Sequence, residues 1–175
     1  MKSISKNQSV SEYKPCYKKK YLPSIVFLKC QGSNSIILPG ASVVAITTIA
    51  NIVTVIVDTV HCDSCIKLEF TSNIIVPITT TNATFNFQIF KICKNQIQAI
   101  PVGPQWTFTR LASLGTSDEF TFFVCDCNTC SCECCTYLVQ VTATVLAAGG
   151  GEIPTTSTVS INSSSLSAIV MDGAN

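Results

Sequence analysis

The segment Thr84–Cys93, TFNFQIFKIC, decides the fold of this chain, because apolar and polar residues alternate along it. Phe85, Phe87 and Ile89 stand at every second position, with polar side chains between them. Successive side chains of a β-strand point to opposite faces of its sheet, whereas an amphipathic helix repeats its apolar residues every three or four positions. The segment is therefore predicted to be a strand with one face in a hydrophobic core.

The same pattern continues outward from this segment in both directions. We expect further strands at 24–30, 36–38, 42–49, 52–60, 66–70, 74–78, 96–100, 105–110, 119–127 and 136–146, with a proline-rich loop at 101–104. No segment has the sustained 3.6-residue period of a capped helix. Many short strands separated by Gly, Pro and Asn turns are typical of antiparallel sandwiches and barrels. The sequence thus predicts an all-β fold, an antiparallel β-sandwich of jelly-roll type.

The apolar run 41–60 is long enough to raise the question of a membrane span. It is dominated by β-branched residues and contains Asn51 and Asp58, which is the composition of strands rather than of a helix facing lipid. We therefore expect no membrane span. A cleaved leader is not expected either, because Pro23 interrupts the short apolar stretch 22–28.

The chain divides into three parts by composition. Residues 1–20 form a polar arm that carries six of the eleven basic residues, 21–148 form the β-sandwich core, and 149–175 begin with three glycines and continue as a Ser- and Thr-rich tail. The tail contains two alternating stretches, 156–161 and 165–170. These are expected either to close the same sandwich as a last hairpin or to pair with the sheet edge of a neighbouring molecule.

The charge of the chain is low: 12% of its residues are charged, 47% are hydrophobic, and the net charge is +1. A surface with so little charge suits packing against copies of the same chain better than mutual repulsion. Proteins that bind nucleic acid carry basic residues over a folded face, whereas here Arg110 is the only arginine and most lysines lie in the arm. We therefore expect no nucleic acid among the partners.

The eleven cysteines are the second decisive feature, since six of them lie between Cys125 and Cys135. A chain of this length buries enough surface to fold without disulfides, so the sulfur is expected to serve durability or the joining of subunits. Cys125 and Cys127 share one face of a strand at about 6.6 Å, near the upper limit for a bond between them, and should find partners elsewhere. Cys134 and the adjacent Cys135 face opposite sides, so one of them is expected to point outward.

A metal site is the alternative use of these thiols. Cys62 with Cys65 and Cys127 with Cys130 form two CxxC pairs, and two such pairs can hold zinc. Hydrophobic strands flank them, whereas zinc knuckles usually carry Gly and basic residues, so we favour disulfides and predict no metal and no cofactor. His61 is the only histidine, and on a strand it faces away from Cys62. No catalytic group is evident, and we predict that the chain is not an enzyme.

Four stretches carry a resemblance to a known family: Ile25–Gly32 (IVFLKCQG), Cys65–Ile74 (CIKLEFTSNI), Phe90–Thr109 (FKICKNQIQAIPVGPQWTFT) and Phe120–Tyr137 (FTFFVCDCNTCSCECCTY). They resemble an uncharacterised cysteine-rich family of anaerobic spore-forming bacteria, which is in turn similar to the subunits of endospore appendages, or spore pili. Those subunits are jelly-roll proteins that stack into helical fibres by β-sheet augmentation. An N-terminal connector of each subunit enters its neighbours and forms disulfides there.

The resemblance implies a structural subunit that self-assembles into a disulfide-cross-linked extracellular filament, a helical homopolymer on the spore surface. Such a subunit is made in the mother cell without a signal peptide, and its partners are copies of itself. Residues 1–20 match the connector, with Cys16 as its cysteine. The implied intersubunit disulfide candidates are Cys16, Cys30, Cys93, Cys125, Cys127, Cys130, Cys132, Cys134 and Cys135, and Cys62 and Cys65 are candidates for other disulfides. The chain departs from the family in its single arm cysteine and its long tail. A zinc-binding protein and a monomeric spore-coat or surface adhesin remain the alternatives.

Overall fold

The computed structural model describes residues 26–42, 44–58, 65–94, 96–111, 115–127, 134–149 and 156–171, which form nine strands. In chain order these are β1 (Val26–Gly32), β2 (Ile36–Ala41), β3 (Ile46–Asp58), β4 (Cys65–Val76), β5 (Thr80–Cys93), β6 (Ile100–Leu111), β7 (Thr116–Asp126), β8 (Cys134–Ala147) and β9 (Thr156–Met171). Among these residues the structure contains no helix long and apolar enough to span a membrane.

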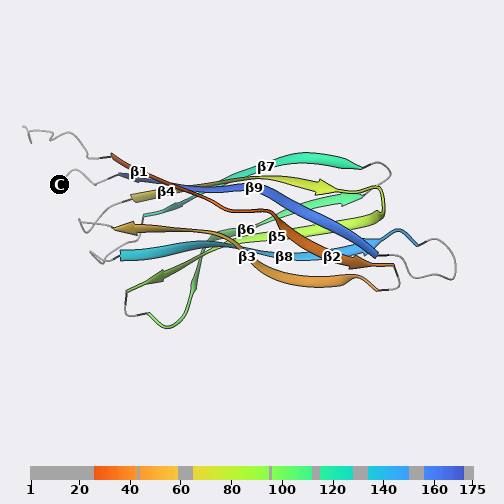
Figure 1. The fold of residues 1–175 in the computed structure, drawn as a ribbon. Coiled ribbons are helices and arrows are strands. Elements are labelled where there is room, and N and C mark those ends of the chain that lie inside the picture. The colour runs from red at the N-terminus through yellow and green to blue at the C-terminus, as the bar shows by residue number, and fades with distance from the viewer. Residues whose placement is uncertain are drawn as a thin grey trace, which may run out of the picture.

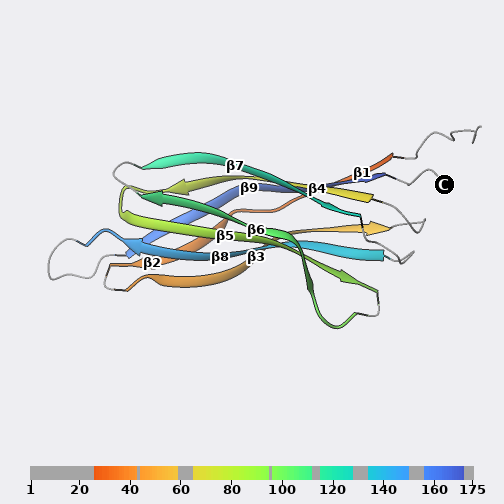
Figure 2. The same ribbon diagram turned by 180° about the vertical axis from the view of Figure 1, so that it is seen from behind.

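The strands form two packed layers (Figures 1 and 2). One layer has the order β6-β5-β8-β3, and the other has the order β7-β4-β9, with β1 and β2 following one another along the far side of β9. Neighbours within each layer are antiparallel. The layers join at one corner, where Ala41 of β2 lies parallel to Leu146 of β8. The prediction of an all-β antiparallel sandwich is confirmed.

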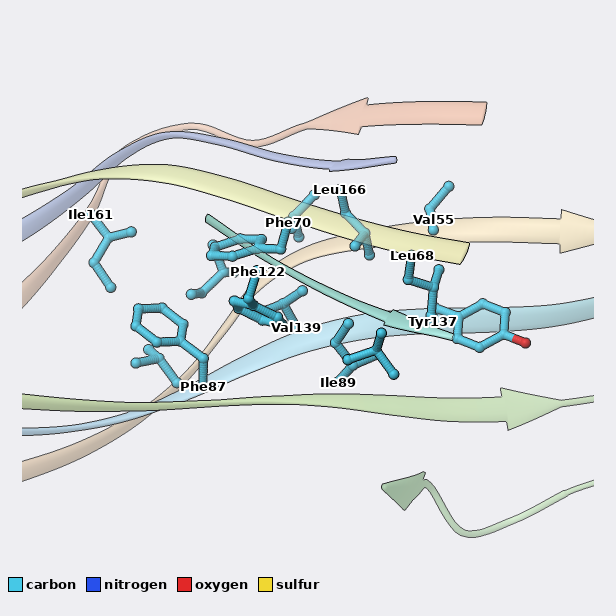
Figure 3. Packing of buried hydrophobic residues seen from close by; sticks show 14 of the residues in the cluster. Val55, Leu68, Phe70, Phe87, Ile89, Phe122, Tyr137, Val139, Ile161 and Leu166 are labelled. Atoms are coloured by element: carbon cyan, nitrogen blue, oxygen red, sulfur yellow. The ribbon is translucent and has the colours of Figure 1, made fainter. Parts of the chain in front are cut away.

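The hydrophobic core fills the space between the layers (Figure 3). Along β8 every second residue is buried, as the two-residue period of a strand requires. Phe70 and Phe122 from one layer meet Phe87 from the other at ring-centroid distances of 5.6 Å and 6.3 Å. Full burial of such a side chain is worth about 1.5–3 kcal/mol, so this core supplies the main driving force for the fold.

Two pairs of predicted strands are single strands in the structure, and one predicted loop is part of a strand. The expected break near 51 is a bulge inside β3, which bends a strand without ending it. The expected break near 72 is absent, because β4 continues through it and the extra residue of the register shift there lies on β9. The loop predicted at 101–104 is wrong, since these residues belong to β6. Gly103 has a φ of 70° there, and a Cβ at this position would lie 2.5 Å from Val124 Cγ1. Prolines are tolerated on β6 because its outer side is a sheet edge.

The Ser- and Thr-rich tail contributes the longest strand, β9, at the centre of its layer. It pairs with β1 and β2 on one side and with β4 on the other. Of the two arrangements left open by the sequence, pairing within the same chain is therefore the one observed. The two stretches expected in the tail are one strand, with an irregularity near Ser163, whose φ is 51°.

Candidate functional site

All seven described cysteines lie at one end of the sandwich, which we call the cysteine end. They are Cys30 on β1, Cys65 on β4, Cys93 on β5, Cys125 and Cys127 on and just after β7, and Cys134 and Cys135 on β8. Val26 and Met171, the first and last described residues, pair with each other at this same end. Figure 1 shows this end at the left, where the C-terminus is marked. The chain therefore enters and leaves the described sandwich beside its cysteines.

Four of these cysteines form two disulfides within the chain. Cys65 bonds to Cys127, which joins the neighbouring strands β4 and β7 across a sequence separation of 62 residues. Cys93 bonds to Cys135, which joins β5 and β8 across 42 residues. The second bond is inside the sandwich, where Cys93 and Cys135 are 5% and 2% exposed. Each bond thus ties two strands of one layer, and no disulfide joins the two layers among the described residues.

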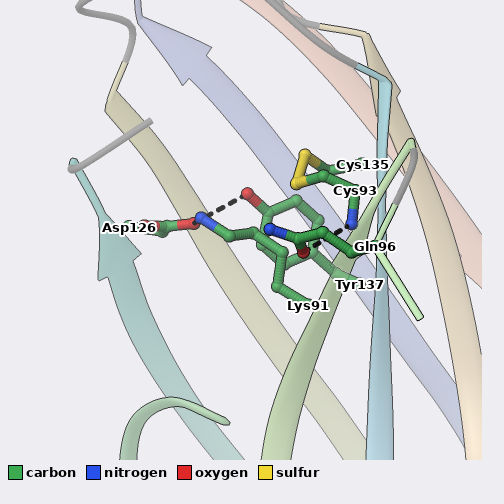
Figure 4. The surroundings of a disulfide bond; sticks show 6 residues. All are labelled: Lys91, Cys93, Gln96, Asp126, Cys135 and Tyr137. Atoms are coloured by element: carbon green, nitrogen blue, oxygen red, sulfur yellow. Dashed lines mark hydrogen bonds and ion pairs between the residues drawn. A yellow bond between two sulfur atoms is a disulfide. The ribbon is translucent and has the colours of Figure 1, made fainter. Parts of the chain in front are cut away.

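A buried polar cluster links the two layers beside the inner disulfide (Figure 4). Lys91 Nζ on β5 lies 2.7 Å from Asp126 Oδ2 on β7, and the Tyr137 hydroxyl on β8 donates a hydrogen bond of 2.8 Å to the same oxygen. Burial and the neighbouring carboxylate raise the pKa of Tyr137 far above its usual value. The tyrosine therefore keeps its proton and remains a hydrogen-bond donor at all ordinary pH values. These two contacts fasten β7 to the opposite layer.

The sequence contains a signal for this cluster, namely a lysine at an inward position of a strand. Phe85, Phe87 and Ile89 occupy inward positions of β5, and Lys91 continues the same alternation toward Cys93. A lysine at an inward position of a strand requires a partner for its charge, because an unpaired buried charge is costly. The partner, Asp126, stands between Cys125 and Cys127.

Three described cysteines are free and exposed: Cys30, Cys125 and Cys134. Cys30 pairs in register with Ser167 and Cys125 with Lys67, positions that share the outer face of the β7-β4-β9-β1 layer. Cys134 lies on the outer face of the other layer, opposite Asp58 of β3. The prediction that one member of the adjacent pair Cys134 and Cys135 points outward is confirmed.

The Cys134 thiol is held in its protonated form by its neighbours. A hydrogen bond to Asp58 raises the pKa of Cys134, whereas the ammonium of Lys29 acts in the opposite direction. Lys29 Nζ also lies 3.3 Å from Asp58 Oδ2, so the contact ties β1 of one layer to β3 of the other. Only the thiolate attacks a disulfide, so Cys134 reacts more slowly than a thiol without the carboxylate beside it.

The other two free thiols lie among exposed apolar side chains. Leu28 is 65% exposed, Phe123 58% and Met171 41%, and all three lie on the outer face that also presents Cys30 and Cys125. Contiguous exposed apolar patches mark surfaces of interaction. We call the group Leu28, Cys30, Phe123, Cys125 and Met171 the thiol face.

The structure places the remaining predicted site residues as follows. Cys16, His61, Cys62, Cys130 and Cys132 lie outside the described residues, as does the whole arm 1–20. Cys93, Cys127 and Cys135 are bonded within the chain, which leaves Cys30, Cys125 and Cys134 as the described candidates for bonds between subunits. The Cys65–Cys127 bond takes one cysteine from each CxxC pair, so a zinc site made of both pairs cannot form while this bond is intact.

The fold and the cysteine end together define a disulfide-bonded antiparallel β-sandwich with free thiols gathered at one end. The chain belongs to the family described as "Domain of unknown function (DUF4489)", whose family model matches residues 24–171. No curated protein matches the chain.

Solved structures with similar folds come from a virus and from carbohydrate-binding modules. The VP2 subviral particle of infectious bursal disease virus has a TM-score of 0.52 and 9% identity, over 95% of this chain and 37% of the viral chain. A structure of the Gx strain of that virus has a TM-score of 0.49 and 11% identity, over 98% of this chain and 38% of the viral chain. A carbohydrate-binding module of the β-sandwich superfamily has a TM-score of 0.39 and 9% identity, over 83% and 56% of the two chains. The chain spans less than half of either viral chain, and the likeness to the subviral particle shows the fold alone.

Proposed function

We propose that the chain is a structural subunit that self-assembles into a disulfide-cross-linked extracellular filament. The sandwich is the building block, its free sheet edges and thiol face make the contacts between subunits, and cysteines at the cysteine end make those contacts covalent. The filament is a helical homopolymer of the endospore-appendage or pilus type. In this proposal the subunit has no catalytic role.

The observation that carries the proposal is the state of the sulfur at the cysteine end. Two disulfides show a domain suited to oxidising conditions, yet three further cysteines are exposed and free among the described residues. Because the chain has eleven cysteines, an odd number, complete pairing within one molecule is impossible. At least one cysteine of every molecule therefore stays free or bonds outside the chain.

Two further observations support self-assembly. The low charge of the chain offers little electrostatic repulsion between copies. One protein of similar fold was solved as a subviral particle, so the architecture is compatible with a subunit that packs against copies of itself. Because that likeness concerns the fold, it supports the proposal without deciding between a shell and a fibre.

The proposed place of action is the spore surface, with synthesis in the mother cell and oxidation after release. In this scheme the arm 1–20 docks into an adjacent subunit, and Cys16 forms a covalent link there. The described sandwich begins at Val26, at the cysteine end. The alternative of a monomeric surface adhesin predicts no polymer.

The direct test is negative-stain electron microscopy of the purified full chain after oxidation, with and without reductant. Fibres that survive boiling and loosen with reductant are the expected result. Discrete monomers in both conditions would overturn the proposal. Elemental analysis of the same sample distinguishes a zinc protein, because zinc-bound thiolates release metal to a chelator and disulfides do not.

Two variants test the arm. Cys16→Ser should leave the fold unchanged and yield fibres that fall apart on heating, whereas fibres as robust as the wild type would remove Cys16 from the scheme. Deletion of residues 1–20 should abolish fibres and leave folded monomer. Normal fibres from the truncated chain would show that pairing of sheet edges is sufficient.

A further inference from the structure

We propose that the β1 edge of one subunit pairs with the β7 edge of the next, and that Cys30 forms a disulfide with Cys125 across this junction. The occupant of each edge is thus a second copy of this chain. The inference rests on the proposed function and names the strands, the register and the two sulfur atoms of one of its contacts.

The two thiols lie on one face of one layer but at its opposite edges. The layer has the order β1-β9-β4-β7, with Cys30 on the first strand and Cys125 on the last. Followed across the three strand pairings, the residue of β7 that lies level with Cys30 is Phe123, and Cys125 lies two residues further along β7. Three strand spacings and two residues amount to about 16 Å, whereas disulfides need Cα atoms within about 7 Å. The two cysteines therefore cannot bond within one molecule.

The direction of the strands fits a repeat in which all subunits have the same orientation. Each step from β1 to β9, β4 and β7 is antiparallel, so β1 and β7 run in opposite directions. A second copy placed beside the first without rotation brings its β7 antiparallel to β1. This contact is heterologous and does not close, which is the condition for an open fibre.

The backbone hydrogen-bonding groups of both cysteines also point to the free edges. The Cα atoms of Cys65 and Cys127 are 4.1 Å apart, the short spacing of a non-hydrogen-bonded pair. Hydrogen-bonded and non-hydrogen-bonded pairs alternate from strand to strand and from residue to residue, so Cys125 directs its amide and carbonyl away from β4. The same alternation, followed from β4 to β9 and from β9 to β1, directs the backbone amide and carbonyl of Cys30 away from β9. Cys30 and Cys125 thus fit together as a hydrogen-bonded pair, whose Cα spacing of about 5.5 Å suits a disulfide.

The composition of the strands favours this junction over one that uses β6 or β2. Pro101 and Pro104 lie on the β6 edge and Pro39 lies on β2, and proline blocks the pairing of an edge strand. Neither β1 nor β7 contains a proline. In the register that places Cys30 opposite Cys125, Gly32 lies opposite Phe123 of the next subunit. An aromatic ring opposite an edge glycine covers the exposed backbone there and stabilises the pair.

The bond forms by thiol–disulfide exchange with a small external disulfide such as oxidised glutathione. One thiolate attacks the glutathione disulfide and releases one glutathione thiol, and the second thiolate then attacks the mixed disulfide and releases the other. Each cysteine loses one proton, the two electrons reduce the glutathione, and a sulfur–sulfur bond joins the subunits.

The test uses the full chain with Cys16, Cys62, Cys130, Cys132 and Cys134 each replaced by serine, so that Cys30 and Cys125 are the cysteines outside the two described disulfides. After oxidation with glutathione disulfide, a ladder of multimers is expected on a non-reducing gel, with a peptide containing Cys30 joined to Cys125 by mass spectrometry. Cys30→Ser and Cys125→Ser in this background should each remain monomeric. An equimolar mixture of the two should give dimer and nothing larger, because one intact pair remains.

A matched control moves the thiol along the same strand. Thr121 lies on the same face of β7 as Cys125, four residues away or about 14 Å. Cys125→Ser with Thr121→Cys should therefore give no ladder. A ladder from either single serine variant, or the absence of the Cys30–Cys125 peptide from oxidised wild type that forms fibres, overturns this junction and leaves the filament intact. Wild-type protein that forms neither fibres nor the peptide overturns both proposals.

Discussion

The two ends of the sandwich are closed by different chemistry. At the end opposite the cysteines, which we call the turn end, the Thr80 hydroxyl lies 2.6 Å from the hydroxyl of Ser157 in a buried contact. Thr80 N also donates to Pro77 O at 3.0 Å within a turn. Gly40 packs against Val145 so closely that a Cβ would lie 2.5 Å from Val145 Cγ1. The cysteine end instead carries two disulfides and a buried ion pair.

The turn end also has an ion pair, in which an Arg110 guanidinium nitrogen on β6 lies 2.8 Å from Asp118 Oδ1 on β7. It shows that this fold can close a sandwich without sulfur among the described residues. None of the described cysteines lies there. The sulfur at the other end is therefore not a requirement of the architecture itself. Three described cysteines are exposed and take no part in the two internal disulfides, and the fold does not explain their presence.

The largest expected effect comes from breaking the buried ion pair at the cysteine end. Asp126→Ala leaves the Lys91 ammonium and the Tyr137 hydroxyl buried without their partner, which should lower the free energy of unfolding by about 3–5 kcal/mol. Urea unfolding of wild type and variant measures this. As a control, Lys91→Met combined with Asp126→Leu removes both charges and should recover most of the loss. An Asp126→Ala protein as stable as wild type would show that the cluster does not fasten the layers.

The inner disulfide should contribute somewhat less. Cys93→Ala with Cys135→Ala removes the cross-link between β5 and β8 and should cost about 2–4 kcal/mol, because the unfolded chain regains the freedom of the closed loop. Thermal unfolding under oxidising conditions is the measurement. Cys134→Ala, one residue away but exposed, should change stability by less than about 0.5 kcal/mol. If the double variant lost no more stability than Cys134→Ala, the inner disulfide would not stabilise the fold.

The sequence predicted the fold class and most strands because the two-residue alternation is strong wherever one face is buried. It failed where a strand contains a bulge, as at Asn51 in β3, since a local break in alternation looks like a turn. It failed again at Pro101 and Pro104, which stop a central strand but are accommodated on an edge. Whether a strand is central or at an edge is a property of the assembled sheet and not of the strand alone.

The cysteines were recognised from the sequence, but their partners were not. The alternation rule correctly required Cys127 to bond outside its own strand, yet the choice of Cys65 depends on β4 lying beside β7. Cys93 and Cys135 meet because β5 and β8 are neighbours through a pairing of segments far apart in the chain. Strand order is decided by the core as a whole, and no single segment contains it.

A smaller loss is expected at the turn end. Ser157→Ala removes the buried hydroxyl that contacts Thr80, and the unpaired Thr80 hydroxyl should cost about 1–2 kcal/mol in urea unfolding. Thr158, the next residue on β9, is exposed, so Thr158→Ala should fall within about 0.5 kcal/mol of wild type. If Ser157→Ala were as costly as Asp126→Ala, the contrast between a weakly and a strongly fastened end would fail.

The last prediction concerns reactivity rather than stability. Asp58 stabilises the protonated Cys134 thiol and so raises its pKa, whereas Lys29 favours the thiolate. Asp58→Asn removes the raising influence and leaves Lys29 in place, so the pKa of Cys134 should fall. At a fixed alkaline pH the thiolate fraction then rises and alkylation by iodoacetamide accelerates, because only the thiolate reacts.

The pH profile of alkylation at Cys134, followed by peptide mass spectrometry, should move to lower pH in Asp58→Asn. Glu69→Gln is the matched control, because Glu69 pairs with Lys67 on the other layer and does not contact Cys134. Its profile should coincide with that of wild type. If all three profiles coincide, Asp58 does not restrain this thiol, and Cys134 then stands on equal terms with Cys30 and Cys125 as a site for bonds between subunits. A shifted profile instead separates one restrained thiol from the two on the thiol face, which sharpens the assignment of the junction to Cys30 and Cys125.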